Sequence, residues 1–94
     1  MLTESKLTNR AILVESIVGS DPLNSTRKRD VVTARALLVW SLFMDGHTEH
    51  EVAEAMGWHR TSVHHYRDIF KDALMYHNRP ELIVAWDELK KVLN

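Results

Sequence analysis

The scarcity and placement of helix-breaking residues constrain this sequence more than any other feature. Its 94 residues include only three glycines and two prolines, and the stretches between them carry apolar residues at helical spacing. Because few turns are available, the sequence predicts an all-α fold, a small helical domain of about five helices that occupies residues 1–94 as one unit. The expected helices span residues 4–18, 29–44, 49–56, 60–76 and 80–93.

The residues at the ends of these helices fit their positions. Gly19 and Gly46 suit the left-handed conformation that closes a helix, and residues 19–25 are typical of a loop. The helix expected at 29–44 is apolar on nearly all sides, which indicates that it is largely buried. Pro80 suits the first position of the last helix, because an N–H at that position would have no intrahelical partner.

Residues 48–66 match the pattern of a helix-turn-helix. Thr48 and Glu51 form the sequence signature of a capping box, which starts the helix at 49–56. Gly57 follows at the turn, where the required backbone conformation is costly for other residues, and Ala53 is small enough for a second helix to approach. The positions of the motif that should be apolar are occupied by Val52, Met56, Trp58, Val63 and Tyr66. This agreement predicts a helix-turn-helix and favours DNA binding over a plain helical bundle.

The second helix of such a motif enters the major groove with its N-terminal end first. Arg60 suits a guanine edge or a phosphate, and Thr61 and Ser62 suit a phosphate or a base. This helix carries no acidic residue before Asp68. If the histidines of this face lie beside DNA, binding is expected to strengthen as the pH falls. The positions predicted to contact DNA are His59, Arg60, Thr61, Ser62, His64 and His65.

The charge of the chain is unevenly distributed. Its formal net charge is −1, whereas DNA-binding domains are usually basic. Four basic residues nevertheless gather around the start of the second expected helix, against the single acid Asp30: Arg27, Lys28, Arg29 and Arg35. Such a basic patch can contact DNA, although long-range steering of the encounter is weak for a nearly neutral protein.

Two stretches of the sequence resemble a known DNA-binding family. Residues 25–35 read Ser-Thr-Arg-Lys-Arg-Asp-Val-Val-Thr-Ala-Arg, and residues 57–63 read Gly-Trp-His-Arg-Thr-Ser-Val. This order is similar to that of the C-terminal DNA-binding domain of the bacterial replication initiator DnaA, which has a trp-repressor-like helix-turn-helix. In that family a basic loop leads into a helix, and the helix-turn-helix carries a Gly-Arg-Asp-His-Thr-Thr-Val signature. The similarity covers about residues 5–73, and the helix at 80–93 lies outside it.

The resemblance implies roles for individual residues. Arg27 and Arg29 would lie in the basic loop that enters the minor groove or contacts phosphate, and Arg35 would reach a base edge. The positions of the family's His-Thr-Thr, which reads the major groove, are taken here by Arg60, Thr61 and Ser62, with His64 nearby.

The sequence also departs from that family. Trp58 and His59 replace the Arg-Asp of its signature, and Ala36 replaces a Gln, so the resemblance does not imply the initiator's own DNA target. There is no phosphate-binding loop, so no ATPase activity is expected. The resemblance therefore implies a stand-alone DNA-binding protein of replication or transcription, of the kind that phages and mobile elements carry.

Other functional classes find little support in the sequence. There is no cysteine, hence no disulfide framework and no thiolate metal site. His47 with His50, and His64 with His65, do not provide the three or four converging ligands of a zinc site. No Gly-rich loop and no supported Ser/His/acid arrangement is present, so neither enzymatic activity nor a cofactor is expected. Without a membrane-spanning run or a signal-peptide layout, the expected location is the cytoplasm.

The last expected helix leaves an alternative open. Its stripe of Leu82, Ile83, Trp86 and Leu89 forms either the last wall of the core, which is favoured in so small a chain, or an exposed patch for a homodimer or a protein partner. A dimer would suit a palindromic DNA site, whereas DnaA-like domains bind as monomers. The competing hypothesis is an adaptor that keeps the fold without binding DNA, although an adaptor has no need of the basic cluster.

Overall fold

A computed structural model describes residues 2–23 and 28–93 of the chain. The described residues form five helices and no strand: α1 (Glu4–Val18), α2 (Arg29–Met44), α3 (Glu49–Met56), α4 (Arg60–Tyr76) and α5 (Pro80–Leu93). These bounds are the predicted ones, and the all-α prediction is confirmed. None of the described helices combines the length and the apolar character needed to traverse a bilayer.

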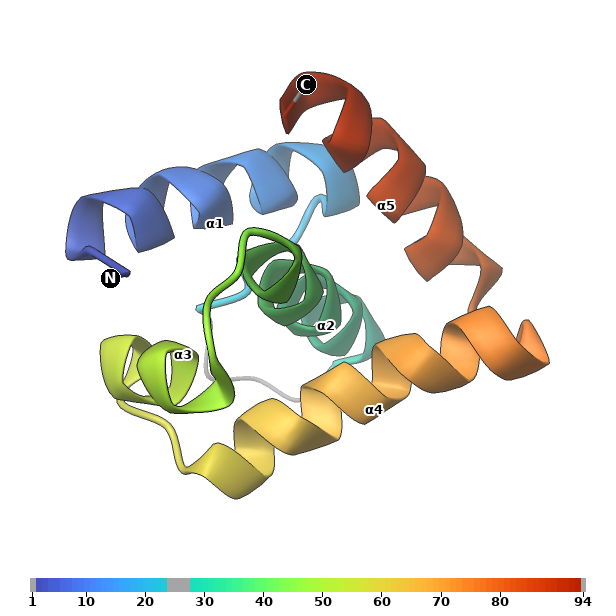
Figure 1. Cartoon of the computed structure of the whole chain (residues 1–94). Coiled ribbons are helices and arrows are strands. Elements are labelled where there is room, and N and C mark those ends of the chain that lie inside the picture. The colour runs from blue at the N-terminus through green and yellow to red at the C-terminus, as the bar shows by residue number, and fades with distance from the viewer. Residues whose placement is uncertain (1, 24–27, 94) are drawn as a thin grey trace.

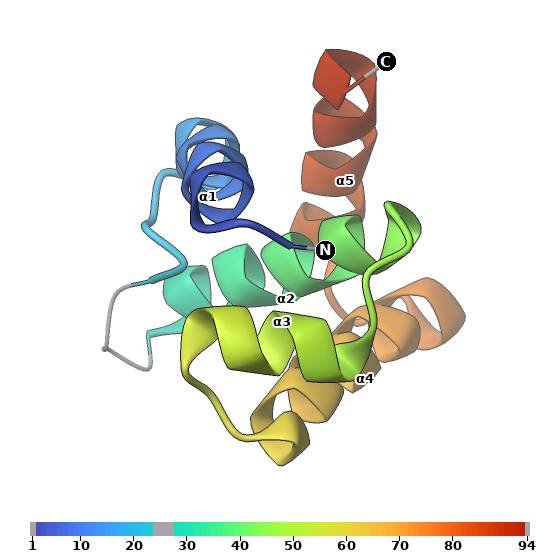
Figure 2. The same ribbon diagram turned by 60° about the vertical axis from the view of Figure 1, so that its left-hand side comes forward.

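Helix α2 runs through the middle of the molecule. α1 and α5 pack on one side of it, and α3 and α4 pack on the other (Figures 1 and 2). This central position explains why α2 is apolar on nearly all sides, since most of its surface packs against other helices. Its buried residues are Val31, Thr33, Ala34, Ala36, Leu37, Leu38, Val39, Ser41 and Leu42.

Local caps set the helix ends where the sequence placed them. The Thr3 hydroxyl accepts a hydrogen bond from the backbone N–H of Lys6 (3.1 Å), and α1 closes at Gly19 with a φ of 85°. At the start of α3, the Thr48 hydroxyl accepts from the Glu51 N–H while the Glu51 carboxylate accepts from the Thr48 N–H, each at 3.2 Å. The capping box is therefore formed in full. The Thr48 N–H, together with His47, holds the pKa of Glu51 below its ordinary value.

The apolar stripe of α5 belongs to the core. Leu82 and Leu89 are fully buried, and Trp86 meets the ring of Phe70 edge to face with centroids 6.0 Å apart. On its other side Phe70 stacks against Trp40, with centroids 4.5 Å apart. Of the two roles considered for this stripe, the structure supports the core wall.

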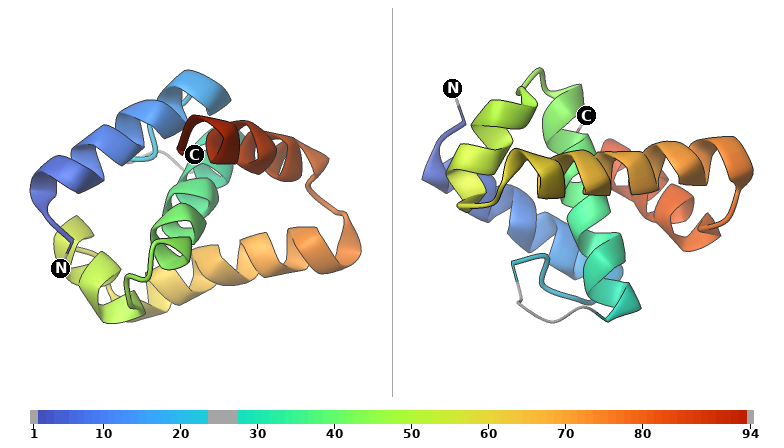
Figure 3. Two further views of the ribbon diagram at one scale, coloured as in Figure 1. Left: turned by 45° about the horizontal axis from the view of Figure 1, so that its top comes forward. Right: turned by 90° about the horizontal axis from the view of Figure 1, so that it is seen from below.

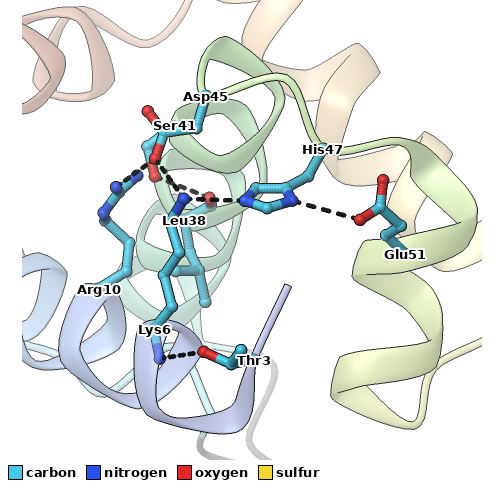
Figure 4. A network of polar contacts seen from close by, with 8 residues as sticks. All are labelled: Thr3, Lys6, Arg10, Leu38, Ser41, Asp45, His47 and Glu51. Atoms are coloured by element: carbon cyan, nitrogen blue, oxygen red, sulfur yellow. Dashed lines mark hydrogen bonds and ion pairs between the residues drawn. The ribbon is translucent and has the colours of Figure 1, made fainter. Parts of the chain in front are cut away.

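A polar cluster ties α1 to the turn between α2 and α3 (Figure 4). Arg10, nine-tenths buried, donates to the carboxylate of Asp45, and Lys6 lies 3.4 Å from the same oxygen. Lys6 also donates to Nε2 of His47 (3.0 Å), and because an ammonium has no acceptor, that ring nitrogen is unprotonated. The Nδ1–H of His47 then points at Glu51 (3.4 Å). The cluster fixes α1 against the start of the helix-turn-helix.

Candidate nucleic-acid interface

Helices α3 and α4 are joined by a tight turn at residues 57–59. Gly57 has a φ of 69°, a left-handed conformation that favours glycine. The N–H of Trp58 donates to the carbonyl of Ala53 (2.9 Å), which closes the C-terminal end of α3. The apolar positions of the motif all point inward. Val52, Ala53 and Val63 are buried in the core, and Met56, Trp58 and Tyr66 pack against it.

The first two turns of α4 lie at the surface. Seen from below, α4 crosses the front of the molecule over α2 (right-hand view of Figure 3). His59 is the N-cap, and its carbonyl accepts from the N–H groups of Ser62 and Val63 (3.0 and 3.3 Å), whereas its side chain makes no cap hydrogen bond. Of the residues predicted to contact DNA on this segment, Ser62 is half-buried and the others are exposed: His59, Arg60, Thr61, His64 and His65.

Two basic side chains of the predicted interface are uncommitted. Arg60 is the first residue of α4, and Lys28 is the N-cap of α2. Both are exposed, and within residues 2–23 and 28–93 neither side chain forms a hydrogen bond or an ion pair. Arg27, which the sequence placed in the same basic segment, lies outside the described residues.

Arg29 is paired within the protein. Its guanidinium donates to Glu81 in the first turn of α5 (2.7 Å), and both side chains are exposed. Burial alone would raise the pKa of Glu81, but its own backbone N–H and the Arg29 guanidinium outweigh this effect and lower the pKa. An exposed pair of this kind contributes at most about 1 kcal/mol, so Arg29 can exchange Glu81 for another anion at little cost.

Arg35 is half-buried and pairs within the protein. Its Nε donates to the carbonyl of Pro22 (3.0 Å) and its Nη1 donates to the hydroxyl of Tyr66 (2.8 Å). The guanidinium carbon lies 5.4 Å from the ring centroid of Trp58 and 5.7 Å from that of Tyr66. The resemblance to DnaA implied that this arginine reaches a base edge, whereas in the free chain its guanidinium lies beside two neighbouring aromatic rings.

His64 takes part in a network between α3 and α4. Arg67 donates to Glu49 and to His64 Nδ1, and Nε2 of His64 lies 3.2 Å from Asp68. Arg67 Nη2 lies 2.8 Å from Nδ1 and 3.2 Å from Nε2 of His64, so the guanidinium and the imidazole form one cluster with the carboxylates of Glu49 and Asp68. The imidazole is therefore engaged on both sides, and Glu49, which also lies 3.2 Å from His64, is neutralised by Arg67.

A surface hollow lies on the face that α2 shares with the N-terminal half of α4. It has a volume of about 760 Å³ and lies between α2, α4 and the loop before α2. The loop contributes Leu23 and α2 contributes Val32 and Arg35, while the turn and α4 contribute Trp58, Thr61, Ser62, His65 and Tyr66. Leu23, the N-terminal half of α2 and the N-terminal half of α4 thus line one hollow, and Lys28, Arg29 and Arg60 are not among its lining residues.

Among the described residues, no group of three His, Asp or Glu side chains is arranged to hold a metal ion. His47 pairs with Glu51 and His50 pairs with Glu54, so the two histidines do not share a carboxylate. No known protein-family profile matches the chain, and no curated protein or solved structure matches it. The candidate interface therefore stands on its own geometry.

Sequence reasoning missed the contacts that tie the interface residues to one another. Arg67 was not singled out, although it neutralises Glu49. Tyr66 and Trp58 were recognised as apolar positions but not as partners of Arg35. The available signal was that both positions are aromatic, since an aromatic ring can pack inward and still offer a π-face or a hydroxyl to an arginine.

Proposed function

We propose that this protein binds double-stranded DNA, with the N-terminal half of α4 in the major groove and the basic start of α2 on the phosphate backbone. The observation that carries the proposal is an exposed face at residues 59–65 that holds Arg60 and hydroxyl groups but no carboxylate. This face belongs to the second helix of a helix-turn-helix, the element that reads bases in that motif.

The charge around this face supports a polyanionic partner despite the overall charge of −1. Lys28 and Arg60 are exposed and uncommitted among the described residues, and Arg29 is held only by an exposed pair. Of the nearby acids, Glu49 and Asp68 both lie beside Arg67, Glu81 pairs with Arg29, and Asp30 lies in the first turn of α2. Against these four acids stand five basic residues, so the local balance is one positive charge: Lys28, Arg29, Arg35, Arg60 and Arg67.

The two groups of residues would have different roles. Arg60 and Thr61 lie at the end of α4 that enters the groove first, and their side chains suit base edges. Lys28 and Arg29 lie on the adjoining segment and suit phosphates, which fix the register of a protein on DNA without reading its sequence. The resemblance to DnaA concerns this same pair of elements, and domains of that family bind as monomers, whereas a dimer would suit a palindromic site. The absence of a phosphate-binding loop and of a signal-peptide layout supports binding in the cytoplasm without an ATPase step.

The test is fluorescence anisotropy with labelled duplexes, a random-sequence pool and a DnaA-box duplex, at several salt concentrations. Arg60→Ala is expected to weaken binding and to relax any preference between the duplexes, by roughly 1–3 kcal/mol for a base-reading side chain. Lys28→Ala should weaken binding to both duplexes equally and reduce the salt slope by about 1. Lys91→Ala, which removes an exposed lysine at the far end of α5, is the matched control and should bind as the unmodified protein does.

A protein-interaction role is the second candidate, and one observation favours it. The last turn of α4 exposes three large apolar side chains, Leu74, Met75 and Tyr76, with exposed fractions of 45, 65 and 66%. The charged residues around these three side chains do not indicate the kind of partner that would bind there. If the protein binds no duplex even at low salt, this turn becomes the first surface to test, by substituting Met75 and looking for loss of a partner or of self-association.

A further inference from the structure

We propose that Arg35 positions the interface through its contacts within the protein and does not itself contact DNA. Its guanidinium joins the segment before α2, the turn before α4 and the body of α4. The inference rests on the proposed function, because it concerns how that same surface is held in shape. It differs from the role that the resemblance to DnaA implied for this residue.

Within the part of the chain that the structure describes, Arg35 contacts three separate segments. The carbonyl of Pro22 accepts from Nε at 3.0 Å, which ties α2 to the described residues that follow α1. The hydroxyl of Tyr66 accepts from Nη1 at 2.8 Å, which ties α2 to the second turn of α4. The indole of Trp58, in the turn that precedes Arg60, lies 5.4 Å from the guanidinium carbon. One side chain therefore holds both halves of the proposed interface.

These contacts require a guanidinium. Its planar shape allows it to lie against two aromatic rings while its edge donates in two directions, to a carbonyl and to a hydroxyl. The rings are themselves in contact, since the centroids of Trp58 and Tyr66 are 5.4 Å apart and the planes are tilted by 42°. A lysine would keep the positive charge but would lose the flat contact and the divergent hydrogen bonds.

Loosening Arg35 would weaken DNA binding without removing any contact to DNA. If the turn at residues 57–59 and the loop at Pro22 sample other positions, only a fraction of molecules presents both halves of the interface together. The apparent dissociation constant then rises by the inverse of that fraction. The loss is the same for every DNA sequence and leaves the number of phosphate contacts unchanged.

The first arm of the test uses the free protein. Hydrogen exchange is measured at the backbone amides of Trp58, Ser62 and Val63, which are all hydrogen-bonded in the turn or at the start of α4. Arg35→Lys and Tyr66→Phe should both speed this exchange, the latter by about fivefold, which corresponds to the loss of one hydrogen bond worth about 1 kcal/mol. The amide of Leu7 in α1, bonded to the Thr3 carbonyl, should be unaffected.

The control for the hydroxyl deletion is Tyr76→Phe, because Tyr76 is exposed at the other end of α4. It should exchange as the unmodified protein does. Circular dichroism identifies any variant that fails to fold. If Arg35→Lys does not fold, Tyr66→Phe, which removes a single oxygen atom, still tests whether the hydrogen bond from Arg35 holds the turn in place. Unchanged exchange in both Arg35→Lys and Tyr66→Phe would overturn the proposal whether or not the protein binds DNA.

The second arm measures DNA binding of the same variants with the random-sequence duplex. Arg35→Lys and Tyr66→Phe should each weaken binding about fivefold or more with an unchanged salt slope, and the double variant should be no weaker than Arg35→Lys alone. If Arg35→Lys binds normally while Arg35→Gln loses about one unit of salt slope, Arg35 contacts a phosphate and the proposal is wrong. If the unmodified protein binds no duplex, the proposed function fails, while the exchange arm still decides whether Arg35 holds these segments together.

Discussion

Replacing Asp45 by Asn should destabilise the protein by about 2 kcal/mol at neutral pH. Asp45 is the acceptor for Arg10, whose side chain is only 8% exposed, while the Asp45 side chain is 30% exposed. One guanidinium nitrogen of Arg10, Nη1, is already buried without a hydrogen-bond partner. The substitution keeps the shape of the side chain but leaves a nearly buried positive charge without its counter-ion.

The magnitude follows from where this pair lies between two limits. Removing one partner of a fully buried ion pair costs about 3–5 kcal/mol, and an exposed pair contributes about 0–1 kcal/mol. Because water reaches Asp45, about 2 kcal/mol is the expected loss. For a domain of this size, that corresponds to a fall in Tm of roughly 8–16 °C.

The effect should depend on pH in a defined direction. Burial alone would raise the pKa of Asp45, but the hydrogen bond and charge of Arg10, aided by Lys6, outweigh burial and hold the pKa below its ordinary value. A carboxyl group whose pKa is lowered by folding contributes stability that is present above its unfolded pKa of about 3.9 and is lost as the pH falls through its folded pKa. The stability difference between the unmodified protein and Asp45→Asn should therefore be constant near neutrality and shrink below about pH 4.

The assay is urea unfolding followed by circular dichroism at a series of pH values, with the free energy of unfolding taken from linear extrapolation. Asp87→Asn is the matched control, because Asp87 is an exposed aspartate whose one ion pair among the described residues is with Lys90 on its own helix. It should change stability by less than about 0.5 kcal/mol. A stability difference for Asp45→Asn that persists undiminished into the acid range would show that the ionised carboxylate is not the source of the effect.

Three further predictions concern single positions. Gly57→Ala should lower the free energy of unfolding by about 1–2 kcal/mol through backbone strain alone, because a Cβ at Gly57 would meet no atom within 4 Å. Gly57→Asn should lower it less in the same urea assay, and equal losses would show that strain is not the cause. Thr48→Ala should lower the free energy of unfolding by about 1 kcal/mol through loss of the capping box, and an unchanged Tm would contradict that contribution. Glu81→Gln should release Arg29 and strengthen DNA binding by up to about fivefold at low salt, equivalent to about 1 kcal/mol. Weaker or equal binding, measured by anisotropy, would show that Arg29 does not contact DNA.

The helices of this fold could be predicted from the sequence because local signals set their ends. Gly19 and Gly57 occupy left-handed C-caps, and Thr48 with Glu51 forms the capping box, all within a few residues of the boundary each one defines. The burial of α2 followed from its composition, which is apolar on nearly all sides. Such features depend on near neighbours in the chain, so their pattern can be read without knowing the fold.

The directions of the polar side chains could not be predicted in the same way. Arg35 is 31 residues from Tyr66, Arg29 is 52 residues from Glu81, and Arg67 is 18 residues from Glu49. Each pair depends on how the helices pack, which no spacing rule along the chain encodes. The sequence shows which positions are basic or aromatic, whereas the packing decides which of them pair inside the protein.

The most direct measurement for the central claim is a titration of ¹⁵N-labelled protein with a random-sequence duplex at low salt, followed by amide chemical shifts. The account predicts that the largest shift changes occur at residues 59–65 of the turn and α4, and at Lys28 and Arg29, and that they weaken as salt is added. An absence of shift changes with excess duplex, or changes confined to α1 and α5, would contradict it.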